Sequence, residues 1–336
     1  MLSPKENYLT MLRGNVPEYV PSPFEPYNDM FAPPTPGVDP LPPLGNPISA
    51  PNGPVYSAWG VRYVGSEDNN WGALPEPGFI ILDDITKWRD VIKNPDMSGF
   101  DWEDYFRKQT AGRNSKDKIV ICGGVEYFQT LISFLGFNEG LLAMYEEPDE
   151  VYALLDYISE YATEVTRKQI QYTNPDILMI GDDCAAYRAP FFSPDMYKRL
   201  IKPFHKKHAD IARDAGLLIA KHDCGRSEDF IEDWLDIGVC TWNPAQVSND
   251  LVGIKKKYVG RLAMEGCWDN QGRVAMLDTP DDEMMAAVEE YVKNFAPGGG
   301  FVYSPMVTGD RTDPRAVRKM DLIKEYFFSH VRNYYS

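Results

Sequence analysis

The sequence has no long hydrophobic run and no regular set of cysteines. No stretch approaches the roughly 20 consecutive apolar residues that a membrane-spanning helix needs, and the polar start of the chain does not resemble a signal peptide. The 5 cysteines in 336 residues are an odd number, which argues against a disulfide framework. We therefore expect free thiols, a cytoplasmic location and no contact with a membrane.

Positive charge is also scarce. The sequence has 34 Lys and Arg residues against 50 Asp and Glu residues, which gives a formal net charge of −16. Nucleic acids, anionic lipid surfaces and large polyanionic substrates all require a basic protein surface. The charge argues against these partners and favours a neutral or aromatic small molecule, although acidic surfaces are also common because they keep proteins in solution. Hydrophobic residues make up 43% of the chain, which is enough for a sizeable core.

The first part of the chain is expected to be irregular. A capping box at Ser3 to Glu6 predicts a short helix. From Pro17 to Pro54 prolines recur too often for a helix, whereas the aromatic residues in and after this stretch are too many for a disordered linker. We expect residues 1–75 to form the helix and an ordered excursion, which serves either as a substrate lid or as a cap on the fold.

After residue 75, apolar segments typical of strands alternate with helical segments. Continuous apolar strands separated by helices indicate a parallel sheet that is buried on both faces. We therefore predict an α/β fold, a (β/α)8 TIM barrel formed by residues 1–336 as a single domain. An open doubly wound sheet is the alternative, but no Gly-x-Gly-x-x-Gly motif follows an early strand. Strands are expected at 79–83, 118–125, 176–181, 217–222, 239–243, 262–267 and 301–305, and helices at 150–172, 194–215 (kinked at Pro203), 228–236, 281–294 and 313–332.

One expected strand, at 217–222, leads into His222-x-Cys224 and then turns at Gly225. Alternate side chains of a strand share a face, so His222 and Cys224 point the same way at its carboxyl end. Imidazole and thiolate together favour Zn²⁺ over Mg²⁺ or Ca²⁺. The alternative is a packed cysteine beside a histidine that its neighbours satisfy, because His-x-Cys is a short pattern.

Further polar side chains gather at the carboxyl ends of the expected strands, where such barrels hold their active sites. Cys267 is the best candidate for a third metal ligand, with Glu265 or Asp183 as an oxygen ligand, and this set leaves one coordination place for substrate. Alternatively, Cys267 is only a buried thiol. Asp182 and Asp183 either cap a helix or include a proton donor of raised pKa. The candidate catalytic residues are Asp182, Asp183, Glu126 and Glu265, and the candidate metal ligands are His222, Cys224, Cys267 and Glu265.

Two more histidines, His205 and His208, lie three residues apart in the helix expected at 194–215. Their spacing would allow a second metal site on one helix face. Lysines flank both of them, and charged helix faces are usually solvated. We therefore expect His205 and His208 to lie on an exposed helix surface.

Several motifs occur in an order and spacing that together are far more specific than any one of them. They are Gly124-Val125-Glu126-Tyr127-Phe128, Glu147-Pro148-Asp149-Glu150-Val151, Gly181-Asp182-Asp183, Ser193-Pro194, Lys202-Pro203-Phe204, His222-x-Cys224-Gly225, Asn243-Pro244-x-Gln246 and Glu265-Gly266-Cys267-Trp268-Asp269. From about residue 118 to its end, the chain thereby resembles the uroporphyrinogen decarboxylase-like barrels. Within them, it resembles the cobalamin-dependent methyltransferases of anaerobes, such as methyltransferase I of aryl methyl ether O-demethylases.

The resemblance implies a zinc site, because members of the methyltransferase branch carry a His-x-Cys pair and a later cysteine. His222 and Cys224 match the pair, but no cysteine lies between Ser304 and Val307, where the later one would fall. Either Cys267 or an acidic residue replaces it, or the chain binds no zinc. The decarboxylases themselves match less well, because they hold their substrate with an arginine-rich amino-terminal motif and residues 14–35 contain no arginine.

The resemblance also implies methyl transfer with a corrinoid. We expect the enzyme to move a methyl group from a guaiacol-like aryl methyl ether to the cob(I)alamin of a partner corrinoid protein, with Zn²⁺ or a protonated carboxyl stabilising the leaving oxygen. A methylcobalamin:thiol methyltransferase, a decarboxylase-type lyase and a non-catalytic corrinoid-binding or aromatic-binding barrel are the alternatives. Aromatic side chains suit a phenyl ring. The expected substrate-binding residues are Tyr27, Phe31, Trp59, Tyr187, Phe192, Trp242, Asn243, Trp268 and Tyr303.

Overall fold

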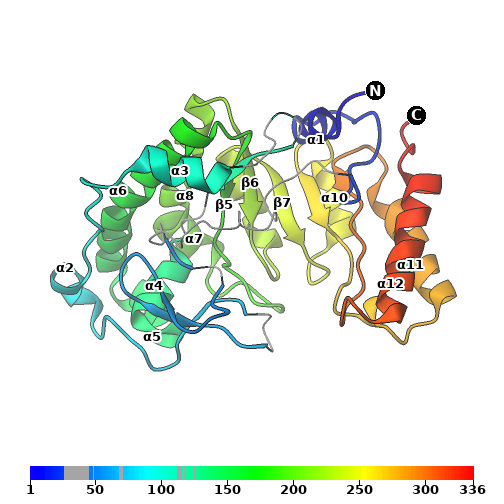
Figure 1. The fold of residues 1–336 in the computed structure, drawn as a ribbon. Coiled ribbons are helices and arrows are strands. Elements are labelled where there is room, and N and C mark those ends of the chain that lie inside the picture. The colour runs from blue at the N-terminus through cyan, green and yellow to red at the C-terminus, as the bar shows by residue number, and fades with distance from the viewer. Residues whose placement is uncertain (26–44, 48, 68–70, 112–115, 117, 124–125) are drawn as a thin grey trace.

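A computed structural model describes residues 1–25, 45–47, 49–67, 71–111, 116, 118–123 and 126–336. Six parallel strands lie side by side in chain order, with helices between them (Figure 1). The order does not reverse, as it would in a doubly wound sheet. Just after the sixth strand, the Tyr303 N–H donates to the Pro21 carbonyl at 2.9 Å, so the segment around Pro21 lies beside this edge of the sheet. The fold is the predicted (β/α)8 TIM barrel. Its parallel strands are β4 (Ile121–Gly123), β5 (Ile177–Ile180), β6 (Leu218–His222), β7 (Val239–Ala245), β8 (Ala263–Gly266) and β9 (Phe301–Val302).

The helices after these strands lie at the expected positions, except that one expected helix is divided into two. The helix expected at 194–215 is two helices that meet at Ile201, and Pro203 lies in the first turn of the second, where its missing N–H is tolerated. The connecting helices are α4 (Phe128–Leu135), α5 (Phe137–Glu146), α6 (Pro148–Thr173), α7 (Pro194–Leu200), α8 (Lys202–Asp214), α9 (Ile231–Asp236), α10 (Leu251–Tyr258), α11 (Asp281–Phe295) and α12 (Pro314–Tyr326). Short 3₁₀ turns precede α9 and α11, at Glu228–Phe230 and Arg273–Ala275, and a π-helical turn, Phe327–Val331, follows α12.

The predicted strand at 79–83 is wrong. These residues form no strand, and the side chains of Phe79 and Ile80 are exposed. The backbone N–H groups of Ile81 and Leu82 both donate to the carbonyl of Phe134, near the end of α4. The apolar run therefore covers a helix terminus instead of joining the sheet. It is followed by Ile85–Lys87 (3₁₀), α2 (Trp88–Val91) and α3 (Trp102–Thr110).

The first helix, α1 (Pro4–Leu12), closes one end of the barrel. Its predicted capping box is present, with Ser3 and Glu6 bonded reciprocally. Figure 1 places α1 at the end of the sheet opposite α4 and α5. Its apolar side chains form one buried cluster with side chains of the strands: Tyr8, Leu9, Met11, Leu12, Ile119, Ile177, Ala220, Ala263 and Val302. The site must therefore open at the other end, where the strands finish.

The described part of the predicted excursion forms a small antiparallel sheet. Its strands are β1 (Val55–Tyr56), β2 (Arg62–Val64) and β3 (Leu74–Pro75), and they pair in chain order. The most proline-rich stretch lies outside the described residues, so its role as lid or cap stays a prediction. Short strands are what the prolines allow.

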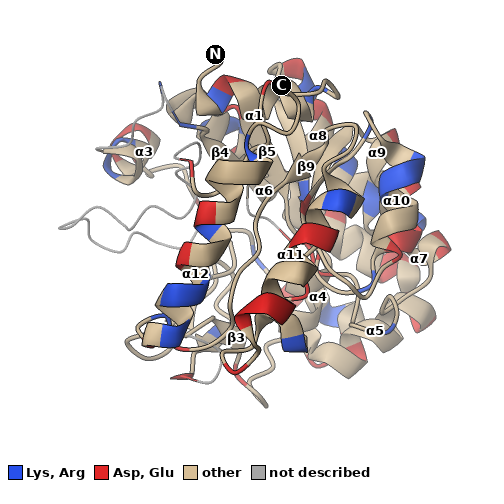
Figure 2. Ribbon diagram, turned by 90° about the vertical axis from the view of Figure 1, so that its right-hand side faces the viewer, with Lys and Arg blue, Asp and Glu red and all other residues tan. Residues whose placement is uncertain are grey.

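Figure 2 shows that the helical face formed by α10, α11 and α12 carries residues of both charge signs. Lys255, Lys256 and Lys257 lie in the last turn of α10, and Asp281, Asp282 and Glu283 in the first turn of α11. Both placements complement the helix dipole. None of the helices in the described residues combines the length and apolar character that crossing a membrane requires.

Asp182 fixes α4 to the end of β5. Its carboxylate accepts hydrogen bonds from the backbone N–H groups of Tyr127, Phe128 and Gln129 at 3.0, 2.9 and 3.0 Å. These N–H groups lie at the start of α4, where no helical carbonyl can accept them. Asp182 is fully buried and has φ 143°, a conformation that L residues rarely adopt. The helix-capping interpretation of Asp182 is therefore the one that the structure supports.

His205 and His208 are buried, so the expectation of an exposed surface is wrong. The Nε2–H of His205 donates to Asp182 at 3.1 Å, and its Nδ1 accepts from the Tyr197 hydroxyl at 2.9 Å. His208 bonds to the hydroxyls of Tyr127 and Thr166 at 2.7 and 2.9 Å. Burial lowers the pKa of His208 to about 3 and also lowers the pKa of His205. Both rings are neutral supports inside the helix layer, and only the lysines around them are solvated.

Lys221 connects the ends of β5 and β6 on the side that faces the helix layer. It is fully buried, and its Nζ donates to the carbonyls of Asp182 and His222 at 3.0 and 2.7 Å. Asp223, also fully buried, lies 3.3 Å from the same Nζ and accepts from the Cys184 N–H and the Ser227 hydroxyl. Burial alone would lower the pKa of Lys221, but Asp223 and the other nearby acidic groups outweigh it and hold the pKa above its ordinary value. The ammonium therefore stays charged and ties the two strand ends together.

Replacing Asp182 with Ala leaves the backbone N–H groups of Tyr127, Phe128 and Gln129, and also His205, without their acceptor. Burial would raise the pKa of Asp182, but the hydrogen bond from His205 and the charge of Lys221 outweigh it and lower the pKa. The group that the substitution removes at neutral pH is therefore a carboxylate. We expect the free energy of unfolding to fall by about 3 kcal/mol or more, measured by urea denaturation. Asp183→Ala, one residue further, is the control and should cost about 1 kcal/mol or less. Equal losses in the two variants would contradict the capping role.

Candidate metal centre

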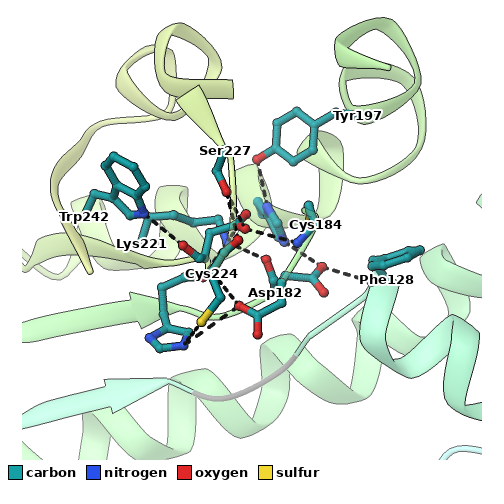
Figure 3. Close-up of polar contacts among 12 residues, drawn as sticks. Phe128, Asp182, Cys184, Tyr197, Lys221, Cys224, Ser227 and Trp242 are labelled. Atoms are coloured by element: carbon teal, nitrogen blue, oxygen red, sulfur yellow. Dashed lines mark hydrogen bonds and ion pairs between the residues drawn. The ribbon is translucent and has the colours of Figure 1, made fainter. Parts of the chain in front are cut away.

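Three side chains meet where β5 and β6 end. Asp183, His222 and Cys224 each offer a ligand atom, and these atoms all lie within 4.8 Å of one another. The His222 Nε2 is 3.9 Å from the Asp183 Oδ1 and 3.8 Å from the Cys224 Sγ. Figure 3 draws Cys224 together with the buried residues Asp182 and Lys221. Because the side chains of Asp183 and His222 are 39% and 37% exposed, a ligand from outside can reach the group.

The donor set fits a zinc ion. Carboxylate, imidazole and thiolate are all zinc ligands, and a site with three protein ligands keeps a place for substrate. Burial raises the pKa of Cys224 to about 12, with the charges of Asp183 and Asp223 adding to the effect. A bound divalent cation would reverse this effect, since coordination deprotonates a thiol. The Cys224 N–H also donates to the Asp183 Oδ1 at 2.8 Å, which fixes one carboxylate oxygen at the group.

His222 is oriented from its far side. Its Nδ1 lies 2.8 Å from the Oδ1 of Asn243, an acceptor, so the ring proton is on Nδ1 and the Nε2 lone pair faces Asp183 and Cys224. A metal-bound histidine needs this arrangement, because its second nitrogen must donate elsewhere. Asn243 was expected to bind substrate. That role stays a prediction, and the structure gives Asn243 a contact that sets the tautomer of His222.

Glu265 and Cys267 do not join the group, so the expectation that they complete the ligand set is wrong for the described residues. Glu265 points into the barrel, where the hydroxyls of Tyr8 and Thr241 donate to its carboxylate. Burial raises its pKa. Cys267 is buried, as the alternative interpretation held, and burial raises the pKa of its thiol. Asp183, the other oxygen donor considered, is the residue that lies beside His222 and Cys224.

Glu126 is the best remaining proton donor. Burial, together with the charges of Asp182 and Asp183, raises its pKa to about 7. A Cβ atom built on Gly181 would lie 3.3 Å from the Glu126 Oε1, so the carboxyl of Glu126 lies close against the backbone at the end of β5. Asp182 is excluded from the same role, because the hydrogen bond from His205, the charge of Lys221 and the Phe128 N–H outweigh burial and lower the pKa of its carboxyl.

Most of the aromatic residues expected to bind substrate belong to the core, which corrects that expectation. Trp59 packs edge-on against Phe134 and Tyr161. Phe192, Trp242 and Tyr303 are buried, and the indole N–H of buried Trp268 donates to the Met306 carbonyl. Tyr187 is 64% exposed in the segment after β5. Tyr27 and Phe31 lie outside the described residues. Large aromatic side chains fill this helix layer because they bury the most area, and sequence pattern does not distinguish that role from ligand binding.

The sequence pattern missed the residues behind the group. Lys221 interrupts an apolar strand, and a lysine inside a strand that is buried on both faces must have buried partners, so a signal existed. Asp223 gave a similar signal. It lies between the inward-facing residues His222 and Cys224, so its charged side chain must face the helix layer on the other side. Tyr8 gave no signal, because its contact with Glu265 joins positions 257 residues apart.

Comparisons with known proteins identify the family and the fold of the chain. Residues 116–306 match the family model of uroporphyrinogen decarboxylase (URO-D). No curated protein matches the sequence. The solved structure of a methyltransferase from Methanosarcina mazei is similar over 98% of this chain and 100% of that chain, with a TM-score of 0.60 and 12% identity. A sugar phosphate isomerase/epimerase from Parabacteroides distasonis, 12% identical, covers 74% of this chain and 83% of that chain, with a TM-score of 0.31.

The structural likeness, at 12% identity, shows that the M. mazei protein shares the fold. The family match establishes more than the fold. Its residues 116–306 are more than half of the 336 residues, and they include β4 to β9 with the whole metal group. It also covers most of the motifs on which the resemblance rested. The chain therefore belongs to the uroporphyrinogen decarboxylase (URO-D) family.

Proposed function

We propose that the protein is a metal-dependent methyltransferase in which Asp183, His222 and Cys224 hold a zinc ion. The observation that carries the proposal is the meeting of three zinc-type donor atoms within 4.8 Å at the open end of the barrel. Active sites of such barrels lie at this end. The shared fold of the M. mazei methyltransferase supports the same class of reaction. The acidic surroundings of the site, with Glu126, Asp182 and Asp183 close together, disfavour a substrate with many carboxylates.

In the proposed reaction, a methyl group leaves the oxygen of an aryl methyl ether and is taken up by the cobalt(I) of a corrinoid on a partner protein. The electron pair of the broken carbon–oxygen bond stays on oxygen, which then takes a proton. Bound zinc supplies a Lewis acid for that oxygen. The chain supplies the rest: Asn243 holds the His222 ring, Asp183 holds the Cys224 backbone, and protonated Glu126 donates to the leaving oxygen.

Thiol methylation is the second candidate, and one observation favours it. Five of the aromatic residues expected to hold a phenyl ring are buried in the core, which leaves Tyr187 as the exposed one among those described. A small aliphatic thiol needs no aromatic pocket, and zinc lowers the pKa of a bound thiol. The same three ligands serve both reactions, so the substrate must be identified by assay.

The metal site is tested by a matched pair of cysteines. The protein should bind about one zinc ion per chain, and Cys224→Ser should weaken binding by at least about 100-fold, because a thiolate ligand is lost. Cys267→Ser is the control and should bind zinc as the wild type does, since Cys267 is not part of the group. Competition with a chromogenic chelator gives both affinities. Loss of zinc in Cys267→Ser with retention in Cys224→Ser would reverse the assignment.

The acid is tested by pH. Below about pH 7 Glu126 is protonated and can donate, so the rate of ether demethylation should be highest there and fall as pH rises through this value. Burial, the larger cause of the shift, persists when a cation neutralises Asp183. Glu126→Gln should lower the rate by about 100-fold or more and remove the fall near pH 7. An unchanged profile in this variant would show that another group donates the proton.

The substrate is tested by incubating the zinc-loaded protein with cob(I)alamin and guaiacol-type ethers. The absorbance of cob(I)alamin should convert to that of methylcobalamin, and His222→Ala, which removes a zinc ligand, should slow the conversion by about 100-fold or more. Conversion of methylcobalamin in the presence of thiols, with no reaction of ethers, would select the second candidate. No response to either would contradict a methyltransferase.

A further inference from the structure

The turn that carries Cys224 is held through its backbone. The five successive N–H groups from Cys224 to Glu228 each donate to an acceptor outside the turn. Two of these acceptors belong to the segment after β5: the Asp183 Oδ1, at 2.8 Å, and the Ala186 carbonyl, at 2.9 Å. The other acceptors are side-chain amides of the segment after β7. The turn is therefore clamped between the two neighbouring loops.

Asn249 uses both ends of its amide on this turn. Its Oδ1 accepts from the N–H groups of Ser227 and Glu228, each at 2.9 Å, and its Nδ2 donates to the Gly225 carbonyl at 2.9 Å. The side chain is buried, where an amide needs such partners. Gln246 completes the set, because its Oε1 accepts from the Gly225 N–H at 2.6 Å. The two amides thus fix the backbone directly after the proposed cysteine ligand.

The glycine of the turn brings it close to the segment after β5. Gly225 has φ 83°, and a Cβ atom built on it would lie 2.5 Å from the carbonyl oxygen of Ala185 and 2.7 Å from that of Ala186. Only a glycine permits this approach. The backbone of the turn is therefore fixed on both sides, and the Cys224 Sγ lies 3.8 Å from the His222 Nε2.

We propose that Asn249 and Gln246 are positioning residues, which hold the turn so that Cys224 faces the other two ligands. They act through the backbone of the turn, without contact to a metal or a substrate. A metal site requires ligands whose positions are set in advance by such contacts. The metal readout of this inference rests on the proposed function, whereas the protection of the Cys224 thiol in zinc-free protein does not.

The test uses Asn249→Ala, which leaves two backbone N–H groups of the turn without their acceptor. Gln246→Leu is the second variant. It removes a single acceptor from a partly exposed position, so it disturbs the fold less and should act in the same direction by a smaller factor. Asn7→Ala is the matched control, because the amide of buried Asn7 also clamps a backbone, with contacts of 2.8 and 3.3 Å to Tyr19, but at the closed end of the barrel.

The first readout is the alkylation of Cys224 by iodoacetamide in zinc-free protein, measured by peptide mass spectrometry. Buried Cys267 is the internal reference. Because the lost acceptors let the turn open more often, Cys224 should react about 10-fold faster in Asn249→Ala than in the wild type, with Cys267 unchanged. Asn7→Ala should keep the wild-type rate at Cys224. An unchanged rate at Cys224 in Asn249→Ala, or an equal rise at Cys224 and Cys267, would overturn the inference.

The second readout is zinc affinity. Asn249→Ala should bind zinc about 10-fold to 100-fold more weakly, as changes outside the ligand set usually do, whereas Asn7→Ala keeps the wild-type affinity. If Asn249→Ala does not fold, Gln246→Leu decides both readouts. A wild type that binds no zinc would contradict the proposed function, and the alkylation rates would still decide the role of the two amides. Wild-type zinc affinity in both variants would leave Asn249 and Gln246 with a packing role only.

Discussion

The site depends on the alternation of side chains at the ends of β5 and β6. Asp183, His222 and Cys224 face inward, and their chain neighbours Asp182, Lys221 and Asp223 face the helix layer. The inward residues form the chemical group, and the outward ones form a buried polar network around the Lys221 ammonium. Each proposed ligand is thus covalently next to a residue that cannot move without breaking a buried contact. Rigidity of this kind is what a three-ligand metal site needs.

The buried network is costly to form, and this cost explains where it is placed. Moving a charged lysine and two carboxylates out of water carries a desolvation penalty of several kcal/mol per ion, which the ion pair and hydrogen bonds must offset. Apolar residues of similar size would serve stability as well. The network therefore indicates a requirement for fixed geometry, and its location directly behind Asp183 and His222 connects that requirement to the site.

The sequence predicted the barrel because its strands are apolar on both faces and its helices carry clear end signals. It predicted His222 and Cys224 because two neighbours in one strand need only the strand period to meet. It did not predict Asp183 as their partner in preference to Cys267, because that choice depends on which strands adjoin in space: β5 lies beside β6, whereas β8 is two strands away. The aromatic residues were misassigned for a related reason. The sequence shows that Trp59 and Tyr303 are aromatic, but it does not show whether their side chains face a ligand or the core.

The position of α1 at the closed end of the barrel has a consequence for the order in which the chain folds during its synthesis. Tyr8 is translated 257 residues before its partner Glu265, and the Val20 N–H donates to the carbonyl of the much later Arg332. Helix α1 must therefore wait for these contacts until β8 and the residues after it have emerged from the ribosome. Closure of this end of the barrel is thus coupled to the synthesis of β8, and a product that terminates before β8 would expose the apolar side of α1 to chaperones and proteases.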